Sequence, residues 1–382
     1  MPDSSHLPAL VAWLAFALAF VFGAVANRVN FCTMGAITDI VNIGDWRRMR
    51  MWLLAIAVAI AGAASLEAAG LIDLSKTIYT TPRIAWLSCL VGGFLFGFGM
   101  TLASGCGSKT LIRLGGGSLK SLVVLIVLAI SAYMTLKGLF AVWRVNALDV
   151  VRWDVAPLGI ARSDLGSFAA RLGGGGPATR LGIALAVAAA IAVFVFASRD
   201  FRSSRELTIG GVVIGAVIVG GWYVSGHIGY VAEDPRTLEE AFVATNSARA
   251  ESFSFVAPAA YLLELLLLWS DQSKLVTFGI AGLLGVAAGS GVTALATGAF
   301  RWEGFASTED LVNHIAGGVL MGFGGVTALG CTIGQGLSGI STLALGSFLA
   351  FGAIIAGCVA ASKYQYWRVG MDNEPRRMKA LQ

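Results

Sequence analysis

The chain has 382 residues, of which 57% are hydrophobic and only 13% are charged, and its mean hydropathy is +0.78. One apolar core under a polar surface could not bury so many apolar side chains, so this composition excludes an ordinary soluble globular protein and predicts an integral membrane protein. The formal charge of +5 does not indicate nucleic acid binding, because no run of lysine and arginine is interleaved with aromatic residues on a polar domain.

Apolar runs of about 20 residues, the length that crosses the hydrocarbon core of a bilayer, recur along the chain. We predict nine transmembrane helices, and we leave open the role of a shorter apolar run at 255–270. The first run lacks a basic n-region and a small-residue cleavage site, so we expect a retained helix rather than a signal peptide. The nine runs lie at 9–26, 51–70, 84–104, 119–140, 180–197, 208–225, 275–298, 311–329 and 337–361.

The basic residues between the runs predict the orientation of the chain. They gather after the first, third and fifth runs and in the tail, and the positive-inside rule places such segments in the cytoplasm. With nine crossings, the N-terminus then lies outside and the C-terminus in the cytoplasm. The basic residues are Arg47, Arg48, Arg50, Lys109, Arg113, Lys120, Arg199, Arg202, Arg205, Arg368, Arg376, Arg377 and Lys379.

The chain contains an internal duplication. Residues 92–106, GGFLFGFGMTLASGC, match residues 317–331, GGVLMGFGGVTALGC, at nine of fifteen positions without a gap. A weaker match at nearly the same offset sets Cys32 opposite Ser254. Four spans in each half and one linking helix would make the second half enter the membrane from the opposite side. This is the inverted-repeat plan of secondary transporters, whose substrate path lies between the repeats.

We therefore predict an all-α polytopic membrane fold with two inverted repeats and short re-entrant helices. The predicted halves are residues 1–140 and 206–382, separated by an outer loop and a linking transmembrane helix at 141–205. Both copies of the repeat end in loops rich in small residues, GCGSKTLIRLGGGS and GCTIGQGLSG. Irregular backbone inside a membrane must be covered by protein or line a polar cavity, so we expect the two loops to meet near the middle of the bilayer.

Five cysteines are present, and none has the CxxC spacing of a zinc or redox site. Cys89 and Cys358 sit inside apolar runs, where a small buried hydrophobic side chain is the simplest interpretation. Cys32, Cys106 and Cys331 each lie at a predicted helix break beside polar or small residues. A thiol is a weak donor and a soft group, so these three suit a polarisable sulfur or selenium atom better than a hard oxyanion, which would call for arginine forks.

The motifs NRVNFCTMGAI, SGCG and GCTIGQGLSG resemble the three cysteine motifs of the YeeE/YedE family of sulfur-transport membrane proteins, in the same order and over nearly the whole chain. The resemblance implies thiosulfate uptake through an hourglass-shaped protein of the bacterial inner membrane, with cysteines stacked along a central path. Carried over by motif, the path residues are Cys32, Cys106, Cys331 and Gln335. The long insert near 141–178 looks less typical of the family.

Three further residues are predicted to belong to the path. Lys109, three residues after Cys106, could draw an anion to the cytoplasmic mouth, although an ordinary positive-inside anchor explains it equally well. Gly105 and Gly330 precede the duplicated cysteines, and we expect both to adopt a positive φ and to lie close together near the midplane.

The other polar candidates are weaker. His227 and His314 sit at the ends of predicted spans, where a histidine is more often simply solvated. Glu264 is an ionisable group within an apolar run and is a functional candidate for that reason, unless the run is a short surface helix.

These observations predict a permease for thiosulfate or a related sulfur-bearing anion, with no catalytic chemistry, metal or cofactor. A selenium-compound transporter and a thiol-based membrane redox or persulfide enzyme or sensor remain as alternatives. No sulfur-carrier domain follows the last predicted helix, so we expect any cytoplasmic acceptor to be a separate protein. The expected partners are the substrate anion and the lipid bilayer, and nucleic acid is not among them.

Overall fold

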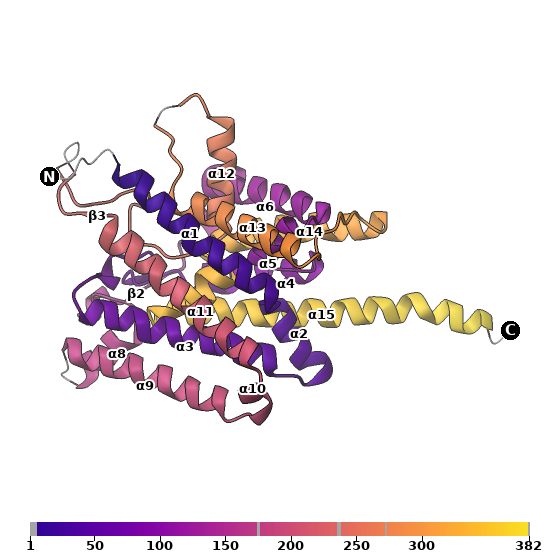
Figure 1. Cartoon of the computed structure of the whole chain (residues 1–382), viewed down its shortest axis with the longest axis horizontal. Coiled ribbons are helices and arrows are strands. Elements are labelled where there is room, and N and C mark those ends of the chain that lie inside the picture. Colours follow the sequence, from indigo (N-terminus) through magenta and orange to yellow (C-terminus); the bar gives the residue numbers. More distant parts are fainter. Residues whose placement is uncertain (1–5, 174–175, 235–237, 272, 381–382) are drawn as a thin grey trace.

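The computed structural model describes the chain except residues 1–5, 174–175, 235–237, 272 and 381–382. Long helices lie side by side along one direction, and the two termini lie at opposite ends of the molecule (Figure 1). The α-helices are α1 (Leu7–Arg28), α2 (Thr33–Ile43), α3 (Arg47–Ala68), α4 (Trp86–Leu102), α5 (Gly107–Gly115), α6 (Leu119–Lys137), α7 (Leu139–Trp143), α8 (Leu165–Gly173), α9 (Pro177–Phe196), α10 (Arg199–Ser203), α11 (Arg205–Tyr223), α12 (Ala257–Leu267), α13 (Phe278–Ala296), α14 (Thr308–Thr327) and α15 (Leu345–Ala380).

Short elements fill the connections between the helices. Three are π-helical turns and two are 3-10 turns. The described strands form two antiparallel pairs of two residues each. These elements are η1 (Leu74–Lys76), η2 (Arg144–Leu148), η3 (Ala156–Leu158), η4 (Val224–Ile228), η5 (Gly334–Gly339), β1 (Arg83–Ile84), β2 (Trp153–Asp154), β3 (Tyr230–Val231) and β4 (Ala241–Phe242).

Among the described residues, eight helical segments are long and apolar enough to cross a membrane, so this is a multi-pass membrane protein. The predicted span at 311–329 is helical as α14 but is not one of these eight, and its first turn carries Glu309 and Asp310. The predicted span at 337–361 begins later, at Leu345, because η5 and a turn precede the start of α15, and the helix extends beyond 361.

Helices α4 and α14, the two copies of the duplicated segment, cross each other at the centre of the fold. A Cβ added at Gly92 would lie 2.6 Å from the amide nitrogen of Ala328, and one added at Gly99 would lie 2.8 Å from the carbonyl oxygen of Gly317. The early part of one copy therefore contacts the late part of the other, which means that the copies run antiparallel. Helix α14 thus lies alongside the candidate spanning helix α4 and runs in the opposite direction.

Further contacts between two helices have an equivalent contact between their counterparts in the other repeat. Helix α1 contacts α13 as α11 contacts α3, and α4 contacts α15 as α14 contacts α6. Helices α1 and α11 also run antiparallel, since Arg28 pairs with Glu206 at 3.0 Å near one end and Val11 packs against Gly229 near the other. This pattern is what two inverted repeats produce, as the duplication predicted.

The insert packs on one end of the bundle, which we call the insert face; the opposite end, which carries Lys109, is the Lys109 face. β2 of the insert pairs with β1, with Arg83 opposite Asp154. The amide of Leu165 donates to the carbonyl of Leu343 at 3.1 Å, and the amide of Leu345 donates to the carbonyl of Ser163 at 2.9 Å. The insert is thus an ordered part of the fold that holds the turn between η5 and α15.

Candidate functional site

Cys32 and Cys106 each stand at the start of a short helix that follows a sharp turn. Cys32 is the N-cap of α2, and its Sγ accepts a hydrogen bond from the Gly35 amide at 3.4 Å. Cys106 is the N-cap of α5 and is fully buried. The turns before them pass through the left-handed region at Asn30, with φ of 52°, and at Ser104, with φ of 56°. The predicted helix breaks are therefore confirmed at both cysteines.

The two thiols meet in the interior. The Cys32 thiol is a close neighbour of the Cys106 thiol. Cys106 Sγ also lies 3.3 Å from the Ser108 hydroxyl. Two cysteines that are 74 residues apart in the sequence thus form one contact, which we call the first pair.

Cys331 forms an equivalent contact in the second repeat. Its Sγ lies 3.9 Å from the Ser254 hydroxyl and accepts a hydrogen bond from the Gly334 amide at 3.5 Å. We call Ser254 and Cys331 the second pair. The duplication sets Ser254 opposite Cys32 and Cys331 opposite Cys106, so the same two repeat positions meet in both halves.

Thr332 connects the two pairs. Its hydroxyl has no hydrogen-bond partner of normal geometry among the described residues, and it lies beside the Cys106 thiol. Thr332 directly follows Cys331, and both residues are fully buried. The interior thus holds a row of sulfur and hydroxyl groups, in which Thr332 lies beside Cys106 and is next to Cys331 in the chain.

Positive charge surrounds the end of this row on the Lys109 face. Lys109 Nζ donates to Asn30 Oδ1 at 3.3 Å, in the turn that leads into Cys32. Arg113 donates to the carbonyl of Ser104 at 3.1 Å, in the turn that leads into Cys106. The two cations thus cap the two turns that present the first pair.

A cavity approaches the other end of the row from the insert face. It measures ≈ 190 Å³, and its lining includes Ser254, which contacts Cys331, and Gly330, which precedes Cys331 in the chain. Arg144 of the insert and Glu251 supply charged side chains to its wall, together with Tyr79. We call this cavity the vestibule. The buried row therefore lies between a basic mouth on one face and the vestibule on the other.

The expectation of a positive φ at Gly105 and Gly330 is wrong. The left-handed residues are their predecessors, Ser104 and Leu329, the latter with φ of 58°. A Cβ would lie 3.1 Å from Lys109 Cγ at Gly105 and 3.2 Å from the Gln335 amide nitrogen at Gly330. These glycines are needed for space beside the next helical turn rather than for their backbone angle.

Gln335 is 2% exposed, and its Nε2 donates to the carbonyl of Ala328. Its Oε1 and the Ser347 hydroxyl lack hydrogen-bond partners within the described part of the chain. Both residues line a small cavity near the insert face, together with Cys89. Gln335 therefore bonds to the turn before Cys331, while its free oxygen lies beside this cavity.

The weaker polar candidates have ordinary structural partners. Glu264 pairs with Lys137 at 2.9 Å and with Lys274 at 2.7 Å at one end of the short helix α12. His227 Nδ1 lies 3.0 Å from the carbonyl of Leu71, and His314 pairs with an aspartate one turn earlier on α14.

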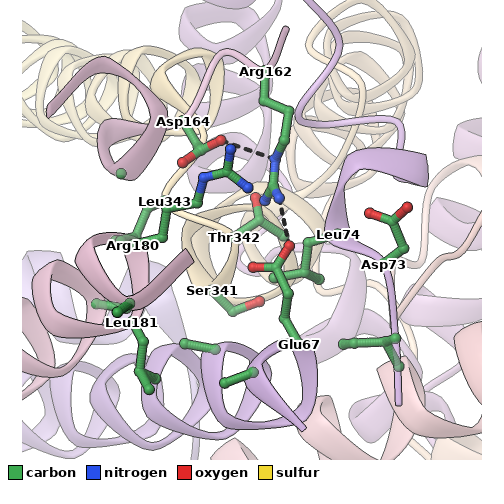
Figure 2. A pocket seen from close by; sticks show the side chains of 16 residues that line it. Glu67, Asp73, Leu74, Arg162, Asp164, Arg180, Leu181, Ser341, Thr342 and Leu343 are labelled. Atoms are coloured by element: carbon green, nitrogen blue, oxygen red, sulfur yellow. Dashed lines mark hydrogen bonds and ion pairs between the residues drawn. The ribbon is translucent and has the colours of Figure 1, made fainter. Parts of the chain in front are cut away.

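A second polar cavity of ≈ 460 Å³ lies where α3, α9 and the insert meet. Figure 2 shows Arg162 between Glu67 and Asp164, with Arg180 nearby. The Arg162 side chain is only 7% exposed, and its Nε lies 3.1 Å from Asp164 Oδ2. No cysteine lines this cavity, and its Arg162 pairs with Glu67 of α3 and with Asp164 of the insert. We interpret it as part of the clamp by which the insert holds the turn before α15.

The sequence profile of a family described as sulphur transport matches residues 28–360. The chain belongs to the sulphur transport family. The match begins just before the turn into Cys32 and ends after Cys358, so it includes both pairs. The family is one of transport proteins, as the resemblance of the three cysteine motifs implied.

Two curated relatives are similar over almost their full lengths. A thiosulfate transporter TsuA of Spirochaeta thermophila is 27% identical over 345 residues, which cover 88% of this chain and 94% of the relative. A thiosulfate transporter TsuA of Escherichia coli is 25% identical over 359 residues, which cover 91% of this chain and 93% of the relative.

Sequence reasoning missed three members of the site. Ser254 was set opposite Cys32 but was not expected to contact Cys331. Thr332 stood unremarked beside Cys331, although the polar residue after a cysteine at a helix break could have indicated a role. Arg144 lies in the insert, outside every motif, and only the fold brings it to the vestibule.

Proposed function

We propose that this chain takes thiosulfate, or a closely related sulfur-bearing anion, into the cytoplasm along the row formed by the two pairs. The observation that carries the proposal is the buried contact of Cys32 with Cys106, repeated by Ser254 and Cys331 on the other side of Thr332. The names of the two relatives support thiosulfate as the substrate.

The chemistry of the row fits a soft anion. A thiol donates a weak hydrogen bond, and its sulfur is polarisable, so it interacts better with a terminal sulfur atom than with a hard oxyanion. Conduction needs sites that bind a substrate strongly enough to admit it and weakly enough to release it. Adjacent thiols and hydroxyls supply such sites in sequence, and the anion passes without forming or breaking a covalent bond.

The charges at the two ends of the row support a direction. We propose that the Lys109 face is cytoplasmic, because the basic residues between spans gather there. The insert face is then outside, with the vestibule open to the incoming anion. Lys109 and Arg113 attract the anion out of the first pair, where a separate cytoplasmic sulfur-carrier protein would receive the sulfur.

An uptake assay tests the substrate. Cells that lack their own thiosulfate uptake, and that express this chain, are supplied with thiosulfate, sulfite, sulfate or selenite as single sources. We expect uptake of thiosulfate and none of sulfate. Uptake of selenite alone would replace the proposal by selenium transport.

Mass spectrometry of the purified protein after exposure to thiosulfate tests the non-covalent mechanism. We expect unmodified thiols at Cys32, Cys106 and Cys331. Added sulfur on any of these cysteines would show covalent transfer and would favour a persulfide enzyme or sensor instead.

A further inference from the structure

Arg144 is a buried cation with an incomplete set of partners. Its side chain is 17% exposed, and its Nε is buried without a hydrogen-bond partner among the described residues. Its ion pair with Asp149 is long, at 3.5 Å, and Asp149 already accepts a hydrogen bond from Ser88 at 2.6 Å. A guanidinium carries five N–H donors, and buried donors left unpaired cost free energy. Arg144 therefore has donors available for a further acceptor.

The position of Arg144 points to the source of that acceptor. The arginine lines the vestibule together with Ser254, whose hydroxyl contacts Cys331. The volume of ≈ 190 Å³ exceeds the share of liquid volume of one water, about 30 Å³, several times over, so a small hydrated anion fits. Planar guanidinium forks recognise oxyanions by paired hydrogen bonds.

We propose that Arg144 forms an outer binding site for the oxygen-bearing end of a small dianion, which it holds before the anion reaches Cys331. This site rests on the proposed function, and it divides recognition into two steps. Arg144 selects for charge and for oxygen atoms, whereas the thiols select for a soft sulfur atom. An anion with both features, such as thiosulfate, satisfies both steps.

The one carboxyl group among the vestibule residues is compatible with this role. Glu251 Oε2 accepts a hydrogen bond from the Ser247 hydroxyl at 3.1 Å. Burial raises the pKa of the Glu251 carboxyl to about 7, so a large fraction of it is neutral at neutral pH. Glu251 then opposes a bound anion at Arg144 less than a fully ionised carboxylate would.

Kinetics of thiosulfate uptake test the outer site. For Arg144→Gln we expect the KM to rise about tenfold or more with little change in the maximal rate, because the initial binding step is weakened. Arg144→Lys keeps the charge but loses the forked pair of donors, so its KM should lie between those of the wild type and Arg144→Gln. The matched control is Arg152→Gln, which changes an exposed arginine of the same insert and should leave the KM unchanged.

A second variant separates an anion site from a purely structural ion pair. Asp149→Asn removes the carboxylate that competes for Arg144, so it should lower the KM for thiosulfate. If Arg144 and Asp149 only stabilised the insert, Asp149→Asn would reduce the protein level as Arg144→Gln does and would not tighten binding. An unchanged KM in Arg144→Gln, or a raised KM in Asp149→Asn, would overturn the outer site.

Binding of labelled thiosulfate to the purified Cys106→Ala protein separates this inference from the proposed function. If the outer site exists, binding persists when Cys106 is changed and is lost when Arg144→Gln is added. If the proposed function fails but the outer site is real, the wild type takes up no thiosulfate while the Arg144-dependent binding remains. Binding that does not depend on Arg144 overturns the inference whatever the uptake assay shows.

Discussion

In the first repeat a thiol meets a thiol, Cys32 with Cys106, whereas in the second repeat the Ser254 hydroxyl meets the Cys331 thiol. The residues one turn further on also differ. The two copies of the duplicated segment are 225 residues apart in the sequence, so Lys109 in the first copy corresponds to Gly334 in the second. Lys109 extends from its helix to hydrogen bond with Asn30. At Gly334 a Cβ would lie 2.7 Å from the Ser254 hydroxyl, so no larger side chain fits.

This difference shows how an inverted duplication yields a directional path. The shared backbone places two helix N-termini and two pairs of side chains about one pseudo-two-fold axis. The side chains then make the two ends of the row unequal. The cation Lys109 lies beside the first pair at the Lys109 face, whereas the closely packed Gly334 lies beside the second pair near the vestibule. Under the proposed function, this asymmetry would give the anion a selective entrance and a basic exit.

The largest expected effect comes from the positions that the repeats share. Cys106→Ala and Cys331→Ala should each abolish thiosulfate uptake while the protein stays in the membrane, because each removes the thiol at the centre of its pair. The measurement is uptake at matched membrane levels. The controls are Cys89→Ala and Cys358→Ala, which change buried cysteines outside the pairs and should reduce uptake little. A reversed pattern would show that the path has been assigned to the wrong cysteines.

The next effect concerns the glycine that distinguishes the second repeat. Gly334→Ala should lower uptake by about tenfold or more, because its Cβ would lie 3.0 Å from Ser254 Cβ and would push the serine away from Cys331. Gly107→Ala is the matched control, since a Cβ there meets nothing closer than 3.9 Å. An alanine at that position also lowers the entropy of the unfolded chain. Equal loss in both variants would mean that the contact with Ser254 does not matter.

A double variant tests the cause of the loss. Ser254→Gly removes the side chain that the new methyl group would strike. If crowding is the cause, Gly334→Ala should reduce uptake much less in the Ser254→Gly background than in the wild type, with Ser254→Gly alone as the reference. No recovery would indicate that the amide of Gly334, rather than the space at its Cα, is what Cys331 requires.

A smaller effect is expected where the repeats already differ. Cys32→Ser makes the first pair chemically like the second, so we expect a reduction in uptake of a few fold rather than a complete loss. Ser254→Cys makes the second pair like the first and should retain uptake. Rates of both variants measured with thiosulfate give the comparison. Complete loss in Cys32→Ser at a normal membrane level would show that sulfur is required at Cys32.

The sequence predicted the parts of the site that depend on local pattern. Helix breaks at Cys32, Cys106 and Cys331 follow from small and polar residues that interrupt apolar runs. The alignment of Cys32 with Ser254 follows from the duplication, and the structure places each of them beside its duplicated cysteine. These features could be predicted because periodicity and repetition are present in the chain itself.

Other features depend on distances that no local pattern encodes. The left-handed residues fall at Ser104 and Leu329 rather than at the glycines that follow them, because a turn can place its strained residue one position earlier. The second copy forms the π-helical η5 where the first forms the regular helix α5, although the two start from the same Gly-Cys step. Arg144 reaches the vestibule only because the insert folds back over the end of α6.

The smallest predicted effect is a pH dependence that arises at the vestibule. Glu251 lies in the connection between β4 and α12, and burial raises the pKa of its carboxyl to about 7. The charged or titratable groups that share the vestibule with it are Arg144, Tyr79 and Tyr261. Only Glu251 among them changes charge near neutral pH.

The sign of that effect follows from the protonation of Glu251. Below about pH 7 the carboxyl is mostly neutral, and above it the negative charge opposes an arriving dianion, so the initial uptake rate should fall a few fold as the external pH rises from 6 to 8. Glu251→Gln should make this profile flat at the higher rate. The control is Glu240→Gln, because Glu240 is exposed and its hydrogen bond with Lys76 holds its pKa below the usual range. A wild-type profile that Glu251→Gln leaves unchanged would place the titrating group outside the vestibule.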